Sequence, residues 1–306
     1  MRPYNDYNTY LKNKYGCKIY RIGLDAGFTC PNRDGTKGTL GCIYCDDSGS
    51  RSPYAKAGSA INDQLDKRIK YLKEKKQAEK FIAYFQAFTN TYAPLDKLKS
   101  IYDTVLPFKE IVGISIGTRP DAVDKDKLAL IASYKERYEV WIEYGLQSSI
   151  DSTLKLLNRG HTLNDFIETS KLTKEAGILQ CAHIIIGLPG ESRTDIIKTA
   201  EILNELNVDG VKIHPLHVLR KSALEKMYNN KEIKILDEAE YAELVCDFLE
   251  NLSGGIIIQR LTGQGTSESH IAPSWATDKT RTLKMIDKIF EKRGSFQGSK
   301  KEKRTI

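Results

Sequence analysis

Strand and helix patterns alternate along most of this chain, and this repeat restricts the possible folds more than any other feature. Short apolar runs rich in β-branched and aromatic residues alternate with longer stretches in which apolar residues recur every three or four positions. Such alternation is typical of right-handed parallel βαβ units, so it predicts a barrel or an open doubly wound sheet. The predicted strands are residues 18–24, 80–86, 111–116, 139–145, 180–187 and 209–215, with a possible seventh at 255–260.

Predicted helices fill the intervals between these strands. They cover residues 61–78, a stretch from about 95, and residues 124–136, 151–158, 163–176, 193–206, 220–227 and 236–252. In both candidate architectures, ligands bind at the carboxyl ends of the strands. The residues that directly follow each strand are therefore the candidates for function.

The two ends of the chain differ from this repeat. Residues 1–17 are rich in tyrosine and are predicted to wrap around the domain, which covers residues 18–260. Residues 261–306 are predicted to form a C-terminal extension, with a Gly/Ser/Thr-rich loop at 262–269, a helix from about Thr277 to Lys292 and a basic tail at 299–306. The tail is either solvated or in contact with RNA phosphate.

The composition argues against a membrane protein. No stretch approaches the roughly 18 uninterrupted apolar residues of a membrane helix, and the polar start of the chain predicts no cleaved signal peptide. We therefore expect a cytoplasmic location. The net charge of +7 slightly favours a polyanionic partner. Of the six cysteines, Cys17, Cys181 and Cys246 stand alone and are expected to pack as small apolar side chains.

The other three cysteines lie close together, directly after the first strand. Eleven residues separate Cys30 from Cys42, and two separate Cys42 from Cys45. Glycines between them let the backbone turn back, so the three thiolates can converge on one metal centre. An iron–sulfur cluster that only transfers electrons normally has every iron bound by protein, so three ligands predict one open iron. A zinc site completed by a histidine is the alternative.

This cysteine loop after the first strand of a βα repeat resembles the radical S-adenosylmethionine (SAM) superfamily. The resemblance implies an α/β fold with a partial (β/α)6 TIM-like barrel. It also implies a 4Fe–4S cluster on the three cysteines, with the amino and carboxylate groups of SAM on the fourth iron. Reduction of such a cluster cleaves SAM to a 5′-deoxyadenosyl radical. The usual cysteine spacing is three and two, and the spacing here resembles a YtqA/YhcC-like bacterial subfamily, related to the catalytic subunit of Elongator and to oxygen-independent coproporphyrinogen oxidase.

The same resemblance implies residues that contact SAM. Tyr44, before the last cysteine, takes the place of an aromatic residue near the adenine. Gln86 and Asn90 follow the second strand, where relatives carry a Gly-Gly-Glu segment for the SAM amino group. The usual carboxylate is absent there, and ordinary loop polars are the alternative. Gln147 and Arg159 reproduce the spacing of the glutamine and arginine that meet the ribose and the carboxylate in coproporphyrinogen-oxidase-like enzymes.

Two more strands complete the candidate SAM site. Glu143 lies near the end of the fourth strand. The turn Gly187-Leu-Pro189-Gly190 follows the fifth and is similar to the turn that lies against the adenine in these enzymes. His183 stands where relatives carry an aspartate for the ribose, and a packed core histidine is the alternative.

Four residues are candidates for contact with the substrate. Arg119 lies in a Thr-Arg-Pro-Asp segment similar to one in the Elongator relatives, and its planar guanidinium can hold a carboxylate or phosphate. A structural pair with Asp121 is the alternative. His214, His217 and Arg220 follow the sixth strand, where they can donate hydrogen bonds or carry protons, or serve structure only.

Together these features predict a radical SAM enzyme. The YtqA-like branch is associated with the tRNA wobble uridine, where 5-carboxymethylaminomethyl-(2-thio)uridine becomes 5-aminomethyl-(2-thio)uridine. The resemblance thus implies a tRNA substrate and a reductase or flavodoxin/ferredoxin-type electron donor. The radical would take hydrogen from the carboxymethyl arm. Alternatives are radical modification of a peptide, protein or small molecule, and a non-catalytic iron–sulfur or zinc sensor that binds nucleic acid.

Overall fold

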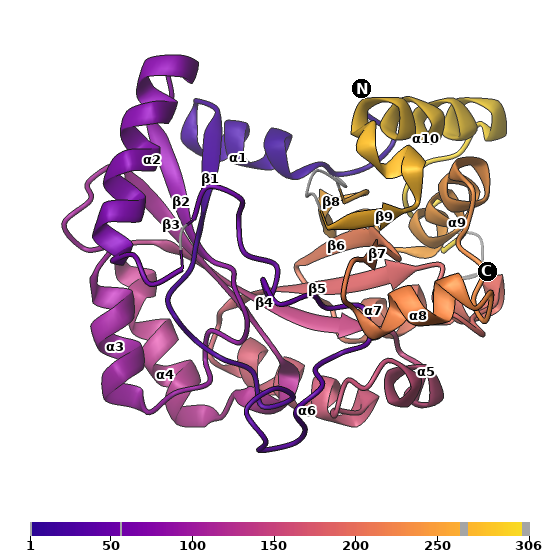
Figure 1. Cartoon of the computed structure of the whole chain (residues 1–306). Coiled ribbons are helices and arrows are strands. Elements are labelled where there is room, and N and C mark those ends of the chain that lie inside the picture. Colours follow the sequence, from indigo (N-terminus) through magenta and orange to yellow (C-terminus); the bar gives the residue numbers. More distant parts are fainter. Residues whose placement is uncertain (1, 56, 264–268, 302–306) are drawn as a thin grey trace.

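A curved, entirely parallel sheet forms the centre of the molecule (Figure 1). The computed structural model describes residues 2–55, 57–263 and 269–301. Neighbouring strands follow the order β1-β2-β3-β4-β5-β6-β8, as expected for consecutive βα units. The strands are β1 (Ile19–Leu24), β2 (Lys80–Phe85), β3 (Ile111–Thr118), β4 (Glu139–Gln147), β5 (Leu179–Ile186), β6 (Gly210–Pro215) and β8 (Ile257–Arg260). The predicted partial barrel is confirmed, and the possible seventh strand is present as β8.

Helices lie around the outside of this sheet (Figure 1). They are α2 (Ile61–Lys76), α3 (Leu95–Asp103), α4 (Lys125–Ser133), α5 (Asp151–Leu156), α6 (Leu163–Glu175), α7 (Arg193–Glu205), α8 (Ala223–Asn229) and α9 (Glu238–Asn251), with short 3-10 turns at Pro120–Ala122, Tyr134–Glu136 and Ser274–Thr277. Thr162, Ser192 and Asp237 begin α6, α7 and α9 with capping boxes, which satisfy the free amides of the first turn. The main core lies between these helices and the sheet.

A further helix within residues 1–17, α1 (Tyr7–Tyr15), covers the amino ends of the strands. Asp6 caps its start, and Gly16 in the left-handed conformation ends it. Tyr7 and Leu11 form a small apolar cluster with residues from the beginnings of several strands, Trp141 of β4 among them. The barrel is therefore closed at the end opposite to the predicted functional edge. The sequence analysis did not predict this helix.

The C-terminal extension packs beside the last strands. β9 (His270–Ala272) pairs antiparallel with β7 (Val218–Leu219), and α10 (Lys279–Arg293) then packs against α9. The Gln297 side chain accepts a hydrogen bond of 2.9 Å from the backbone N–H of Asn5, so the two ends of the described chain lie close together here. Residues 264–268 of the predicted loop and 302–306 of the predicted basic tail lie outside the described residues. None of the helices described is long and apolar enough to cross a membrane.

Candidate active site

A cavity of about 420 Å³ opens at the carboxyl ends of the strands. It is lined by all three clustered cysteines and by most of the other candidates. These are Tyr44, Gln86, Arg119, Glu143, Gln147, Arg159, His183, His214 and His217. Asn90, Arg220 and the turn residues Gly187, Pro189 and Gly190 are not part of the lining.

The cysteine loop is held in place by Asn32, which the sequence analysis did not single out. Its buried side-chain amide donates to the backbone oxygen of Asn158 at 2.6 Å and to that of Arg159 at 3.0 Å. Gly41 has φ of 71°, and a side chain there would crowd Arg33. The loop is thereby fixed against the segment that follows α5, so the cysteines face the end of β4.

Arg159 links the cysteines to β4. One of its terminal nitrogens, Nη1, lies 3.2 Å from the Cys42 sulfur and 3.0 Å from the Tyr44 hydroxyl, and its Nη2 donates to the backbone oxygen of Gly145. A hydrogen bond from the Cys45 thiol, helped by the positive charge of Arg159, holds the pKa of Cys42 well below its usual range. Cys42 thus favours the thiolate, whereas the same hydrogen bond, together with burial, raises the pKa of Cys45 well above its usual range.

Gly145 lets two of the candidate side chains pack directly against the β4 backbone. A Cβ atom at this position would lie 2.8 Å from the side-chain nitrogen of Gln147 and 3.0 Å from Nη2 of Arg159. Gln147 itself has φ of 73° and sits where the pairing of β4 with β5 shifts register. The side chains of Gln147 and Arg159 therefore both lie beside Gly145, and both line the cavity. One ligand could contact both of them there.

Arg119 forms the pair that was the structural alternative. Its guanidinium donates twice to the Asp121 carboxylate, each bond being 2.9 Å, and Lys37 pairs with the same carboxylate. A third bond of 2.5 Å goes to the backbone oxygen of Arg159. The remaining nitrogen, Nη1, is buried without a hydrogen-bond partner among the described residues. Arg119 thus positions the Arg159 segment and keeps one free donor.

The two candidates after β2 differ from each other. The Gln86 side chain accepts from the Ser52 hydroxyl at 3.1 Å and donates to the backbone oxygen of Ser50 at 2.8 Å. Asn90 is fully buried and donates to the backbone oxygen of Gly117 at 2.8 Å. Only Gln86 faces the cavity, whereas Asn90 ties the β2 loop to β3.

Glu143 lies at the centre of an ionic network inside the barrel. Its fully buried carboxylate pairs with Arg21 of β1 and Lys212 of β6, and accepts from Nε2 of His183 at 2.8 Å. Burial alone would raise the pKa of Glu143, but the charges of Arg21 and Lys212 hold it well below its usual range. Both carboxylate oxygens are engaged. The sequence signal for this network is a charged residue, Arg21 or Lys212, within each of two largely apolar strands.

Histidines gather in the part of the cavity lining that comes from β5, β6, the turn before β7, and β9. Nδ1 of His217 and Nε2 of His270 are 3.0 Å apart, and the rings of His183 and His214 are 5.8 Å apart. Burial lowers the pKa of His217 to about 4 and that of His183 to about 4, so both are neutral near pH 7. Arg220 contributes its backbone amide to Ser269, while its side chain is exposed outside the cavity.

The donor set fits an iron–sulfur cluster with SAM. Cys30, Cys42 and Cys45 line one cavity beside the cationic Arg159, and Gln147 lines the same cavity. In such a cluster each thiolate binds a different iron, so the sulfurs need not point at one atom. Among the described residues, no three His, Cys, Asp or Glu side chains converge on the position of a single ion.

Comparison with protein families identifies the chain. A model described as the radical SAM superfamily matches residues 34–203, and a model described as the radical SAM C-terminal domain matches residues 208–292. The chain belongs to the radical SAM superfamily. Members of this superfamily use a 4Fe–4S cluster and SAM, and the expected family is confirmed.

Several relatives resemble this radical SAM protein over nearly its full length. Protein MJ0486 of Methanocaldococcus jannaschii is 42% identical over 96% of this chain and 91% of its own. YtqA of Bacillus subtilis is 39% identical over 97% and 92%, and YhcC of Escherichia coli is 34% identical over 94% and 92%. The predicted YtqA/YhcC-like branch is therefore confirmed.

More distant similarity connects this radical SAM protein with Elongator. The tRNA uridine(34) acetyltransferase of Methanocaldococcus infernus is 31% identical over 44% of this chain and 25% of its own. The solved structure of Elp3 from the same archaeon superposes with a TM-score of 0.65 at 20% identity, covering 91% of this chain and 64% of that one. At this identity the superposition shows a common fold.

Proposed function

We propose that this radical SAM protein cleaves SAM reductively at a 4Fe–4S cluster held by Cys30, Cys42 and Cys45. The observation that carries the proposal is the presence of all three thiols in one cavity, with the Arg159 guanidinium against Cys42. When bound, the cluster and SAM would supply a 5′-deoxyadenosyl radical that removes a hydrogen atom from the substrate. An electron donor of the reductase or flavodoxin/ferredoxin type would deliver the electron.

In this proposal, side chains around the cysteines orient SAM. Arg159 can turn part of its guanidinium to the SAM carboxylate, because such charge-assisted bonds are stronger than its contact with the Tyr44 hydroxyl. Gln147 beside it offers an amide to the ribose hydroxyls, and Gln86 offers its side-chain oxygen to the amino group. Tyr44 would lie near the adenine. Glu143 and His183 would support these side chains from the barrel interior rather than contact SAM, since they are hydrogen-bonded to each other.

We further propose that the substrate is the wobble uridine of tRNA, with 5-carboxymethylaminomethyl-(2-thio)uridine converted to 5-aminomethyl-(2-thio)uridine. The partial similarity to a tRNA uridine(34) acetyltransferase and the net charge of +7 support an RNA substrate. Release of the carboxymethyl group as glyoxylate consumes one water and removes two electrons. One leaves as the abstracted hydrogen atom, and the other passes, with a proton lost to water, to a one-electron acceptor such as an oxidised iron–sulfur centre.

An anaerobic assay tests the cofactor chemistry. The protein is reconstituted with iron and sulfide, reduced with dithionite and supplied with SAM, and 5′-deoxyadenosine is measured. We expect product with the wild type and none with Cys45→Ala. Equal yields from the two proteins would contradict cleavage at this cluster.

Nucleoside analysis tests the substrate separately. Digests of tRNA from a strain lacking the gene should contain more carboxymethylaminomethyl uridine and less aminomethyl uridine than the parent strain. Complementation with the wild type should restore the ratio, and Cys45→Ala should not. An unchanged ratio in the deletion strain would remove the tRNA assignment and leave the SAM chemistry standing.

A further inference from the structure

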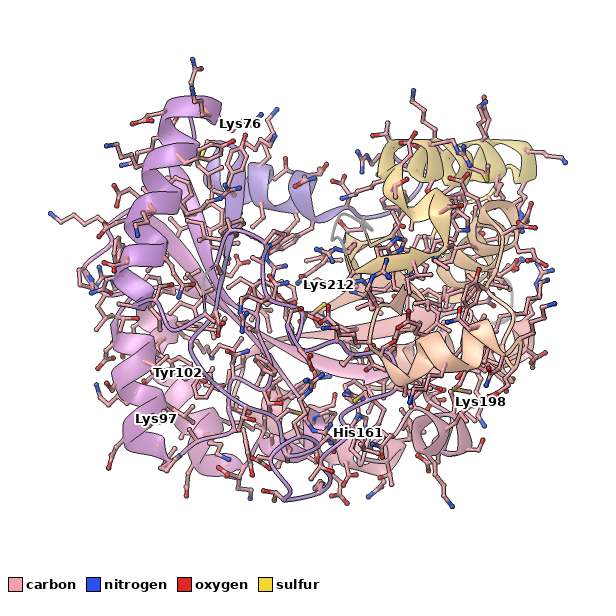
Figure 2. The ribbon with its side chains drawn as sticks, viewed as in Figure 1. Lys76, Lys97, Tyr102, His161, Lys198 and Lys212 are labelled. Carbon is pink, nitrogen blue, oxygen red and sulfur yellow. The ribbon has the colours of Figure 1, made fainter. Side chains whose placement is uncertain are left out.

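A second group of positive charges lies in the same cavity, and two of them come from strands distant in sequence from the cysteine loop. Lys212 comes from β6 and Arg260 from the end of β8, and both line the cavity. Lys212 is 2% exposed, and Figure 2 shows it near the centre of the molecule, inside the curve of the sheet. Arg159 and Arg119, by contrast, belong to the segments after β4 and β3 and contact the cysteine end.

The charges in this interior group do not balance. Three cations, Arg21, Lys212 and Arg260, face one carboxylate, that of Glu143, which leaves a net charge of +2 (three minus one). The other carboxylate in the cavity lining, Asp46, is bonded to Ser48 and Ser269 instead. The histidines add no charge near pH 7, because burial lowers the pKa values of those along this wall.

Donors without partners accompany this excess charge. Arg260 makes no hydrogen bond or ion pair with any residue of the described ranges 2–55, 57–263 and 269–301, although it faces the cavity. Nε of Arg21 and the side-chain nitrogen of Gln259 are also buried without hydrogen-bond partners in those ranges. Arg260 is exposed to the solvent of the cavity, so its guanidinium is free to bind an anion. Within the described ranges, the buried donors of Arg21 and Gln259 lack the partner that such groups normally have.

We propose that Lys212 and Arg260 form a subsite for a carboxylate of the substrate. The inference rests on the proposed function, in which the carboxymethyl arm of the modified uridine carries that carboxylate. An anion entering from the cavity would accept from the free guanidinium of Arg260 and from the Lys212 ammonium, whose other partner is Glu143. The subsite would hold the arm in the same cavity as the cysteines and would distinguish the carboxymethylated nucleoside from its product.

The central experiment compares two tRNAs that differ only in carrying carboxymethylaminomethyl or aminomethyl uridine at the wobble position. Dissociation constants are measured for the wild type and for Arg260→Gln, Arg260→Lys and Lys212→Met. We expect the wild type to prefer the carboxymethylated tRNA about 10-fold or more, as for one lost charge-assisted contact. Arg260→Gln and Lys212→Met should lose most of that preference, and Arg260→Lys should retain part of it.

Two controls separate this role from folding and from SAM binding. Lys198→Gln removes a positive charge from the outer surface of α7 and should keep the wild-type preference (Figure 2). SAM affinity and substrate-free formation of 5′-deoxyadenosine should stay within about twofold of wild type in Arg260→Gln. A selective loss of SAM affinity would overturn the proposal by assigning Arg260 to the cofactor. Equal weakening of both tRNAs would overturn it in favour of a phosphate contact.

A small-molecule probe makes failure of the subsite distinguishable from failure of the tRNA assignment. Iminodiacetate reproduces the NH–CH2–COO⁻ arm, and its binding is measured by calorimetry with the wild type and with Arg260→Gln. Binding that Arg260→Gln abolishes supports the subsite even if tRNA proves not to be the substrate. The subsite would be refuted, and the proposed function would stand, if Arg260→Gln converts tRNA and binds the carboxymethylated tRNA with the same affinity and the same preference over aminomethyl tRNA as the wild type.

Discussion

Glu143 is the residue on which the interior of the barrel depends. It is fully buried, and its carboxylate is the acceptor shared by Arg21, Lys212 and His183. Two buried cations facing one another across a barrel would repel strongly in a low-dielectric interior without it. The carboxylate therefore stabilises the fold and at the same time keeps Lys212 in the cavity wall.

Replacement of this carboxylate should destabilise the protein severely. Glu143→Gln leaves two buried cations without their counter-charge, and removal of one member of a buried ionic group costs about 3–5 kcal/mol. The free energy of unfolding in urea measures the change. Glu243→Gln is the matched control, because Glu243 pairs with Arg293 near the surface and such pairs contribute about 0–1 kcal/mol. Similar losses in the two variants would refute this role.

Stability should also decrease as pH is lowered, because protonation of His217 favours the unfolded chain. Burial, followed by the neighbouring His270, lowers its folded pKa to about 4, whereas an unfolded histidine titrates near 6.5. The unfolded chain therefore binds the proton first as pH falls from about 6.5 towards 4, and stability declines in that window. Between pH 8 and pH 5 this single group should cost about 2 kcal/mol. His217→Gln should show a correspondingly weaker decline in urea unfolding, and an unchanged pH profile would contradict it.

Among the elements, α1 covers the amino end of the barrel and closes it there. Leu11 is 2% exposed and packs in the cluster that contains Trp141 and Cys181, at the end away from the cavity. Leu11→Ala should therefore cost about 2–5 kcal/mol of unfolding free energy. Leu156→Ala is the control, since Leu156 is 44% exposed, and it should change stability little. The loss should not alter SAM affinity at a temperature where the variant is folded, because α1 does not touch the cavity.

The sequence predicted the repeating elements and the C-terminal helix α10, and it missed α1, β7 and β9. The βα units have apolar periodicity, so all seven strands of the main sheet could be placed to within a few residues. In α1 only Tyr7 and Leu11 are buried, too few to produce a helical pattern among tyrosines and lysines. β7 and β9 contain two and three residues, and their pairing depends on the return of the C-terminal extension. Such short elements carry no periodicity of their own.

The site was predictable where a motif marked it and hidden where only tertiary structure did. The cysteine spacing and the Gln147–Arg159 spacing identified residues that the fold brings into one cavity. Asn32 and Arg260 carry no comparable signal, because their importance comes from contacts with segments distant in sequence or from the lack of such contacts. The one sequence feature that indicates this part of the site is a single charged residue within a largely apolar strand, such as Lys212 in β6.

At the scale of the whole molecule, the cavity holds two cationic groups with different expected roles. Arg159 beside the cysteine loop is one, and Lys212 of β6 with Arg260 of β8 is the other. A partial barrel suits this division, because consecutive strands present side chains around one cavity while different segments supply each group. Anionic groups of the cofactor and of the substrate would then be held apart, with the reacting atoms between them.

This division predicts that two similar substitutions affect different ligands, one the binding of SAM and the other the binding of the substrate. Arg159→Gln should raise the dissociation constant for SAM about 10-fold or more and abolish substrate-free formation of 5′-deoxyadenosine, because it removes a charge-assisted contact with the SAM carboxylate. Arg260→Gln should leave both nearly unchanged and instead raise the KM for the carboxymethylated substrate. Arg137→Gln, at an exposed arginine that donates to the backbone of Leu106, is the control for general loss of charge. If Arg159→Gln and Arg260→Gln change SAM binding and substrate KM by the same factors, the two cationic groups do not act separately.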